Sequence, residues 1–273
     1  MNFAFSEEQV ELRKVAADFL TNKSAEADVR ALMETDEGYD PAVWSQMAEQ
    51  LGLQGLAIPE EYGGSGYSYV ELCVIFEEMG RRLLCAPFFS TVALAANALL
   101  HSGDDDAKAR YLPGIASGET IATVAFTEEN GRWDESGIEM EAAASDEGHT
   151  LTGTKSYVID GHIASLILVA ARTPEGVSLF AVDGDASGLG RTPLSTMDQT
   201  RKQAKLDFDN TPATLIGAAG SGWDTLRTML QLAVVALASE QMGGAQECLD
   251  SAVQYAKDRV QFGRPIGSFQ AIK

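Results

Sequence analysis

The chain has 273 residues, 45% of them hydrophobic and 22% charged, which is typical of a globular protein with two or three packed layers. Its formal net charge of -20 excludes a basic surface for nucleic acid or anionic membrane, although a local anion site stays possible. Three well-separated cysteines, an acidic amino-terminal segment and the lack of a long apolar run predict reduced thiols, no targeting peptide, no membrane span and a cytoplasmic location.

The first 118 residues carry helix start signals and are predicted to form a helical domain. Ser6, Asp40 and Ser68 each stand at an N-cap position before a run of apolar residues at helical spacing. The apolar stretch 88–100 predicts a buried helix. A shorter helix over 107–112 is expected to end at the proline that follows it.

Short segments rich in Val, Ile and Thr, bounded by Gly, Asp and Pro, occupy residues 119–218. In one of them Ala204, Leu206 and Phe208 alternate with polar residues and therefore share one face. No helix-length segment intervenes, which disfavours a doubly wound parallel sheet and predicts an antiparallel barrel or sandwich. The fold class is therefore α+β multidomain, with a helical domain over 1–118, a central β domain over 119–218 and the start of a helical bundle over 219–273.

The last stretch, RVQFGRPIGSFQAIK, follows a long helix that is apolar almost all round from Met229 to Ala238. A basic final turn followed by Gly263 and Pro265 is a common way for a helix to end. Ser268 is placed to cap a new helix, of which only about one turn would be present. We therefore expect a truncated chain whose partner helices lie beyond its last residue.

The pattern R-x-Q-F-G-x-P-I-x-x-F-Q, present in full over residues 259–270, resembles the C-terminal signature of the acyl-CoA dehydrogenase family of flavoproteins. The resemblance implies a helical, a β and a four-helix-bundle domain in this order, with FAD and acyl-CoA between the last two. It also implies that the signature reaches a neighbouring subunit and holds the pyrophosphate and adenine side of its FAD. The cofactor contacts implied here are Arg259, Gln261, Phe262, Ile266, Phe269 and Gln270.

The segment AFTEENGRWD, residues 125–134, taken alone reads as a polar hairpin, but it resembles the first flavin-binding segment of the family. The family pattern is a hydroxyl residue, Glu, and then Gly-Ser-Asp, and here Arg132 and Trp133 replace the Gly-Ser pair. In the family, the serine of this pair helps to bind substrate, so the departure affects the contact to the substrate. The bulkier Arg and Trp are expected to narrow the cleft. The cofactor contacts implied by this segment are Val124, Phe126, Thr127, Arg132 and Trp133.

The segment KSYVIDG, residues 155–161, is similar to the second flavin segment of the family. Tyr157 fits the role of an aromatic residue near the flavin ring, whereas Ile159 offers only a backbone contact. The resemblance further implies substrate contacts from Trp133, Ser90, Thr91 and Ala233.

The activity implied is α,β-desaturation of an acyl-CoA thioester in lipid metabolism, in which a carboxylate removes the α proton and FAD accepts the β hydrogen as hydride. At one family location of this base the chain has Ala233 and Val234, and neither accepts a proton. Glu240, seven residues further on, is a helical carboxylate of the kind that is mostly solvated or paired. The catalytic residue is therefore unknown, and we expect the base outside this sequence or on another subunit.

Two other functions stay open. A non-catalytic partner subunit would complete the FAD site of a neighbour in a hetero-oligomer, and the apolar Ala233 and the altered Arg132-Trp133 pair favour it. An acyl-CoA oxidase or flavin monooxygenase would share the scaffold. The partners expected are acyl-CoA, an electron-transfer flavoprotein or similar acceptor, and further subunits of a homo- or hetero-oligomeric dimer or tetramer that shares FAD sites. Isolated histidines predict no metal site.

Overall fold

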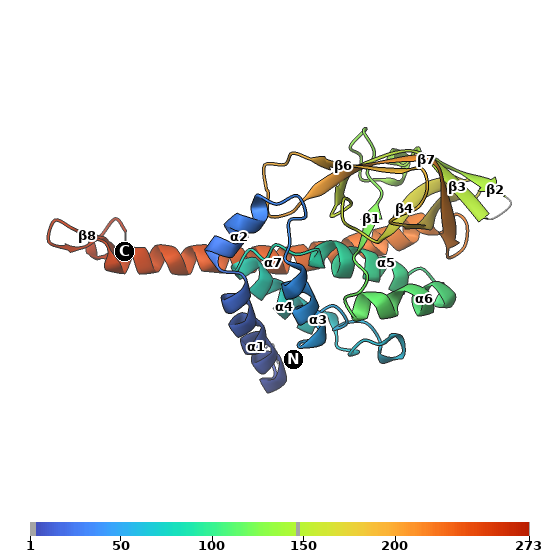
Figure 1. Ribbon diagram of the computed structural model, residues 1–273. Coiled ribbons are helices and arrows are strands. Elements are labelled where there is room, and N and C mark those ends of the chain that lie inside the picture. The colour runs from blue at the N-terminus through green and yellow to red at the C-terminus, as the bar shows by residue number, and fades with distance from the viewer. Residues whose placement is uncertain (1–3, 146–147, 273) are drawn as a thin grey trace.

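The structure is a computed structural model that describes residues 4–145 and 148–272, and Figure 1 shows helices before and after a central sheet. All three predicted helix starts are confirmed. The Ser6 hydroxyl accepts from the Gln9 amide, Asp40 caps the next predicted helix, and Ser68 forms a second capping box. The helices of this part are α1 Glu7–Lys23, α2 Glu26–Met33, α3 Pro41–Glu49, α4 Tyr69–Arg81, π-helix η2 Phe89–Ala96, α5 Asn97–Leu100 and α6 Asp105–Ala116, with a 3-10 turn η1 at Glu60–Tyr62.

Two details of the helical part differ from expectation. The helix α6 does not end at Pro113 but continues to Ala116, because Leu112 and Ile115 are fully buried and hold the last turn in place. The stretch 88–100 is helical as predicted, but residues 89–96 form a π-helix whose longer hydrogen-bond spacing the apolar pattern did not indicate.

The central sheet closes on itself as a barrel. The strands are β1 Ala122–Ala125, β2 Glu141–Ser145, β3 Gly148–Ile159, β4 Leu166–Thr173, β5 Gly176–Asp183, β6 Leu189–Leu194 and β7 Gln203–Ile216, with a 3-10 turn η3 at Glu135–Gly137. Pairing runs from β4 through β2, β3, β7 and β5 back to β4, and β1 and β6 extend the sheet on β4 and β7. The pairing is mostly antiparallel as predicted, but β1 pairs with β4 in parallel and β2 touches β4 in the same sense.

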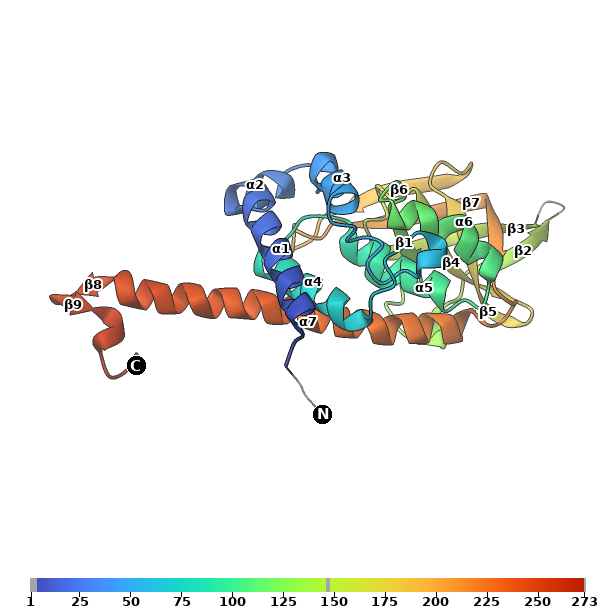
Figure 2. The same ribbon diagram turned by 90° about the horizontal axis from the view of Figure 1, so that it is seen from below.

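One long helix, α7 from Gly222 to Asp258, packs against both the helical part and the barrel. Figures 1 and 2 show its first half running along the barrel and the amino-terminal helices, and its last turns projecting beyond them. After α7 the chain forms a short hairpin with two residues in each strand, β8 Val260–Gln261 and β9 Arg264–Pro265. The 3-10 turn η4 Ile266–Ser268 follows it. Ser268 therefore does not cap a helix within the described residues, since its hydroxyl donates to the Pro265 carbonyl.

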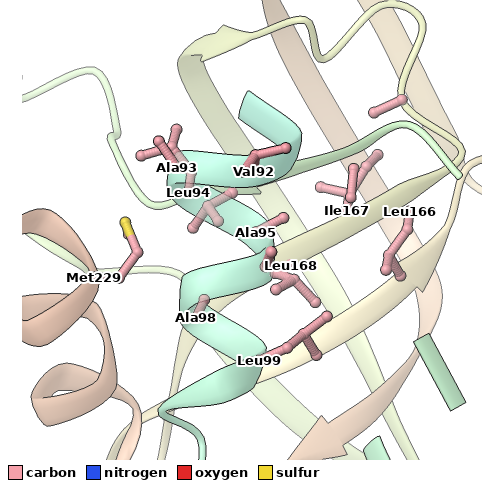
Figure 3. Packing of buried hydrophobic residues seen from close by; sticks show 14 of the residues in the cluster. Val92, Ala93, Leu94, Ala95, Ala98, Leu99, Leu166, Ile167, Leu168 and Met229 are labelled. Atoms are coloured by element: carbon pink, nitrogen blue, oxygen red, sulfur yellow. The ribbon is translucent and has the colours of Figure 1, made fainter. Parts of the chain in front are cut away.

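The core lies where the helices η2 and α5 pack between the barrel and α7. Figure 3 shows Leu168 of β4 on one side of this helical segment and Met229 of α7 on the other. Alanines at positions 93, 95 and 98 are fully buried, and their small side chains allow the backbones to come close. In the described residues, no helix is both long and apolar enough to cross a membrane.

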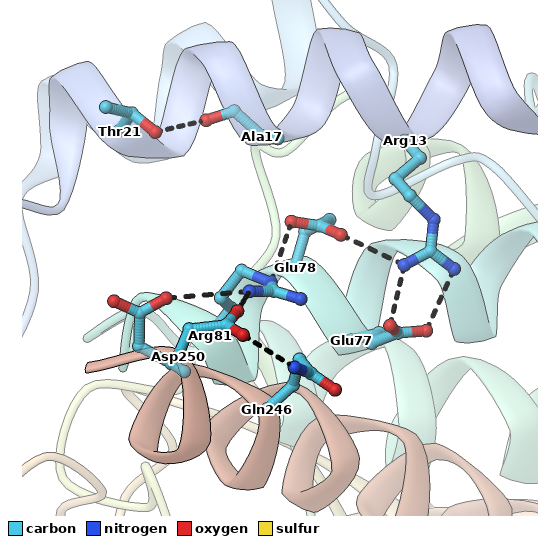
Figure 4. A network of polar contacts seen from close by, with 9 residues as sticks. Arg13, Ala17, Thr21, Glu77, Glu78, Arg81, Gln246 and Asp250 are labelled. Carbon is cyan, nitrogen blue, oxygen red and sulfur yellow. Dashed lines mark hydrogen bonds and ion pairs between the residues drawn. The ribbon is translucent and has the colours of Figure 1, made fainter. Parts of the chain in front are cut away.

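The crossing of α4 and α7 depends on two glycines that face each other. A methyl group at Gly80 would overlap the carbonyl of Glu240, and one at Gly243 would overlap the carbonyl of Glu77. Around this contact Arg13 pairs with Glu77 at 2.6 Å and Arg81 pairs with Asp250 at 3.0 Å, as Figure 4 shows. The glycine contact therefore sets the separation of the two helices that carry the charged network.

We expect Gly80→Ala to lower the free energy of unfolding by about 1–3 kcal/mol, because the helices must move apart to admit the new methyl group. The matched control is Gly244→Ala, where the nearest atom would lie at an ordinary 3.5 Å. This change is expected to be neutral or to stabilise by up to about 1 kcal/mol through helix propensity. Urea unfolding of both variants measures the difference, and equal effects would contradict the assigned role of Gly80.

Candidate functional site

A cavity of about 450 Å³ opens between the barrel and α7. Its lining comes from η2, from the end of β1 and the segment after it, from the end of β3, from the start of β7 and the loop before it, and from one face of α7. Seven residues predicted from the sequence line it together, namely Val124, Phe126, Thr127, Trp133, Tyr157, Ile159 and Ala233. Ten further lining residues were not predicted, namely Phe89, Leu94, Gly131, Ser156, Val158, Arg201, Gln203, Leu230, Val234 and Leu237.

Tyr157 reaches the cavity through an irregularity of β3. The register of β3 against β7 shifts between Lys155 and Val158, and Tyr157 has a φ of 57°, which is uncommon for a residue with a side chain. Its side chain is consequently 58% exposed, although its neighbours Ser156 and Val158 on the same strand are buried. A strained residue at a cavity wall is often part of a functional site.

Two hydroxyl groups face the cavity without a protein partner. The Ser156 amide donates to the Thr127 carbonyl at 2.8 Å, which ties β3 to the segment after β1. Both residues line the cavity, and their side-chain hydroxyls make no hydrogen bond within the described part of the chain and are not fully buried. They offer polar contacts next to the apolar Phe126 and Ile159, an arrangement that fits a flat ligand with apolar faces and a polar edge.

A buried ion pair supports this wall from behind. Lys155 is fully buried, and its Nζ lies 2.6 Å from Oε1 of Glu128. The Glu128 carboxylate also accepts the backbone amides of Glu139 and Met140. Burial lowers the pKa of Lys155, while the hydrogen bond and the charge of Glu128 raise it. The pair fixes the position of Thr127, which directly precedes Glu128.

Trp133 and Arg132 take different positions. The Trp133 ring is 65% exposed at the cavity and meets Phe126 edge to face, with ring centroids 5.3 Å apart. Arg132 does not line the cavity, since its guanidinium pairs with Asp134 at 3.2 Å on the exposed side of the loop. Of the two residues that replace the Gly-Ser pair, only the tryptophan narrows the opening.

Ser90 and Thr91 lie inside the protein, behind the cavity wall, and not on it. Both are fully buried, and the Thr91 hydroxyl donates to the Ala122 carbonyl at 3.2 Å. The Ser90 hydroxyl donates to Oδ2 of Asp160 at 2.6 Å. Burial raises the pKa of Asp160 to about 6, although the hydrogen bond from Ser90 and the charge of Arg201 act in the opposite direction.

The raised pKa of Asp160 predicts a loss of stability as pH rises from about 4 to about 6, because in this window the folded state binds the proton more strongly than the unfolded state. Asp160→Asn keeps an acceptor for Ser90 and removes the titration. We expect this variant to be more stable than the parent above pH 6, by about 1–3 kcal/mol, and to lose most of this advantage below pH 4.

Unfolding in urea at several pH values measures this effect. The control is Asp207→Asn, because the hydrogen bonds from Thr154 and Lys205 lower the pKa of this exposed carboxyl. Its stabilising contribution is present at neutral pH and is lost on acidification, so the control has the opposite sign. A parent protein whose stability rises between pH 4 and pH 6 in step with its Asp160→Asn variant would contradict the assignment.

No residue in the lining is an obvious proton acceptor. The lining residues, all within the described part of the chain, include no Asp, Glu or His. Ala233 is 4% exposed and Val234 borders the opening. Glu240 does not reach the cavity, since its carboxylate pairs with the Arg201 guanidinium at 2.6 Å.

The carboxyl-terminal motif lies far from this cavity on the same chain. Arg259 follows α7 directly, roughly 40 Å from Ala233 at the rise of an α-helix. Phe262 forms the hairpin turn with a φ of 53° and is 94% exposed, while Phe269 packs edge to face against it. The hairpin therefore presents its motif at the tip of the long arm seen in Figures 1 and 2, away from its own cavity. The motif residues Gln261, Ile266 and Gln270 lie on this same hairpin and the turns after it.

Three family models match the chain in order. They are the acyl-CoA dehydrogenase N-terminal domain over residues 6–119, the middle domain over residues 123–211 and the C-terminal domain over residues 220–273. The chain is 35% identical over 268 residues to a protein of Mycolicibacterium smegmatis named acyl-CoA dehydrogenase IpdE2, with 98% of this chain and 70% of that protein covered.

Two solved structures are also similar. The structure described as the Tcur3481-Tcur3483 steroid ACAD G363A variant shares 34% identity and a TM-score of 0.85, with 97% of this chain and 71% of that chain covered. The ChsE4-ChsE5 complex from Mycobacterium tuberculosis shares 28% identity and a TM-score of 0.86, with 99% of this chain and 72% of that chain covered.

Proposed function

The chain belongs to the acyl-CoA dehydrogenase family, and we propose that it is a subunit of an FAD-dependent enzyme that desaturates an acyl-CoA thioester between its α and β carbons. One observation carries the proposal: Phe126 and Thr127 from one segment, Tyr157 from a second and Ala233 from α7 line the same cavity. We also propose that the chain divides into a helical domain over residues 1–118, a β domain over 119–218 and the start of a helical bundle over 219–273.

The cavity fits the isoalloxazine part of FAD. The free hydroxyls of Thr127 and Ser156 offer contacts to a polar edge, and Phe126, Ile159 and Tyr157 offer contacts to flat faces. When bound, FAD supplies an acceptor for the hydride that leaves the β carbon. The protein residues orient the ring, exclude water through the apolar wall and place the thioester near Trp133.

The arm with Arg259 and Phe262 is proposed to hold the pyrophosphate and adenine side of an FAD whose ring lies in the cavity of a neighbouring subunit. An exposed guanidinium suits a phosphate, because a single Arg–phosphate contact at about 4 Å contributes a few kcal/mol at an effective dielectric near 20. Gln261, Ile266, Phe269 and Gln270 would complete the contact. Such an assembly is an oligomer that shares FAD sites and passes electrons to an electron-transfer flavoprotein or a similar acceptor in the cytoplasm.

A second candidate, the non-catalytic partner subunit, is favoured by the absence of a carboxylate among the described lining residues. Two similar structures carry paired protein names, Tcur3481-Tcur3483 and ChsE4-ChsE5, and the latter is called a complex. In this role the chain would supply its arm to a subunit that holds the catalytic base. The Tcur3481-Tcur3483 protein is a steroid ACAD, which supports a bulky, ring-bearing acyl group as the substrate here.

Expression of the complete protein, alone and together with a family member from the same genome, separates the candidates. Bound flavin in the visible spectrum and acyl-CoA-dependent reduction of an artificial acceptor by the protein alone would support the dehydrogenase. Flavin and turnover only in the mixed complex would support the partner role, and peroxide release would indicate an oxidase. Absence of flavin and of turnover in every combination would contradict the proposal.

A further inference from the structure

The loop that joins β1 to β2, residues 126–140, carries Trp133 at the mouth of the cavity. The Trp133 side chain lines the cavity and is 65% exposed. Its ring meets Phe126 edge to face, and its indole N–H makes no hydrogen bond within the described part of the chain. A large side chain with so few contacts of its own keeps one position only when the backbone that carries it is fixed.

Contacts within this loop join its two halves. The Asn130 side chain donates to the Gly137 carbonyl at 2.9 Å and accepts the Arg132 amide at 2.9 Å. Gly137 also packs directly on Arg132, since a methyl group at position 137 would lie only 2.6 Å from Cβ of Arg132. The segments before and after Trp133 are therefore held together as one unit.

Arg172 on β4 attaches this unit to the barrel. Its Nε donates to the Ile138 carbonyl at 2.5 Å, and its Nη2 donates to the Glu135 carbonyl at 2.7 Å. Backbone pairing is short here, because among the described residues β2 pairs with β4 only between Glu141 and Arg172, and the Arg172 amide donates to the Met140 carbonyl. Since a charged donor makes the stronger hydrogen bonds, the guanidinium is a principal link between the loop and β4.

We propose that Arg172 is a positioning residue, which holds Trp133 across the mouth of the cavity and thereby limits the access of water and O2 to a flavin ring bound inside. Arg172 does not line the cavity itself, so it acts through the loop. Exclusion of solvent strengthens the polar interactions inside a site and prevents side reactions of a reduced cofactor. This inference rests on the proposed function and adds to it a residue outside the cavity.

The first test follows the motion of Trp133 and does not depend on bound FAD. Time-resolved anisotropy of tryptophan fluorescence is measured on the complete protein. Arg172→Met is expected to add a nanosecond component, because the released loop lets the ring move on this timescale. Trp133→Phe in the same background should remove the component, which assigns it to Trp133 and not to Trp44, which is 4% exposed.

The matched control is Arg191→Met. The Arg191 guanidinium also braces the barrel, by donating to the carbonyls of His162, Ala164 and Gly184, and none of these residues lines the cavity. We expect no new nanosecond component in this variant. A component of equal size in Arg191→Met and Arg172→Met would show general loosening of the barrel and would overturn the inference.

The second test measures access to the flavin. The flavin-loaded assembly is reduced with one equivalent of dithionite and mixed with O2, which takes two electrons and two protons from the reduced flavin and leaves as H2O2. We expect Arg172→Met and Trp133→Ala each to raise the rate of flavin reoxidation by about 10-fold. The double variant should be no faster than Trp133→Ala, because Arg172 acts through Trp133.

Gly137→Ala keeps the test decisive if Arg172→Met does not fold, since the added methyl group pushes Arg132 away and opens the loop from within. It is expected to raise the reoxidation rate as well. Parent rates in Arg172→Met and Gly137→Ala, or effects that multiply in the double variant, would overturn this inference alone. Absence of flavin from every assembly would overturn the proposed function, whereas the anisotropy measurement would still decide whether Arg172 positions Trp133.

Discussion

Glu128→Ala is expected to lower the free energy of unfolding by about 3–5 kcal/mol, because it leaves Lys155 buried without its partner. The Lys155 side chain is fully buried, and its Nζ–Oε1 contact with Glu128 is 2.6 Å long. The change also removes the acceptor of the Glu139 and Met140 amides, so the segment that carries Thr127 loses its anchor. Chemical unfolding measures the loss, and weaker flavin retention should accompany it.

The matched control is Lys205→Ala, which removes a pair between Lys205 and Asp207 on the same barrel. Both partners there are well exposed, at 38% and 47%, and such pairs contribute only about 0–1 kcal/mol. If Glu128→Ala costs no more than the control, the buried pair does not stabilise the cavity wall as argued.

Arg259→Ala is expected to weaken FAD binding by about 100-fold, since the arm loses its charge-assisted contact to the pyrophosphate. The guanidinium makes no hydrogen bond or ion pair within the described residues, so its removal should leave the fold intact. Recovery of flavin fluorescence on dilution measures the dissociation constant. Circular dichroism should be unchanged.

Lys257→Ala serves as the control for Arg259→Ala. It removes a cation from the last turn of α7, two residues before the motif, and preserves the motif itself. We expect flavin affinity within about 3-fold of the parent protein, because exposed charges at a distance are screened by salt. Equal losses in both variants would mean that only the net charge of the arm matters.

The sequence predicted the helix starts well because capping is local. Ser6, Asp40 and Ser68 satisfy backbone amides two or three residues away, so tertiary packing was not needed to identify them. The continuation of α6 through Pro113 and the parallel pairing of β1 with β4 depend on contacts between distant segments. Neither is encoded in a window of neighbouring residues.

The same distinction applies to the candidate site. Thr127 and Tyr157 were found because each lies in a segment that resembles a known one, and the structure places both on one cavity. Arg201 and Gln203 were not predicted. Arg201 lies in a loop and Gln203 is the first residue of β7, and neither place has a repeating sequence pattern that would identify a site residue. The buried partnership of Glu128 with Lys155 joins two such segments and is visible only once the barrel closes.

The most direct measurement is an experimental structure of the FAD-loaded assembly. We expect the guanidinium of Arg259 to lie within hydrogen-bond distance of the FAD pyrophosphate, with Phe262 beside it, and the flavin ring of that FAD to lie in the cavity of a neighbouring subunit. A second flavin ring against Thr127 and Tyr157 of this chain would complete the arrangement. A structure in which Arg259 faces solvent, or in which no FAD touches either the arm or the cavity, would contradict it.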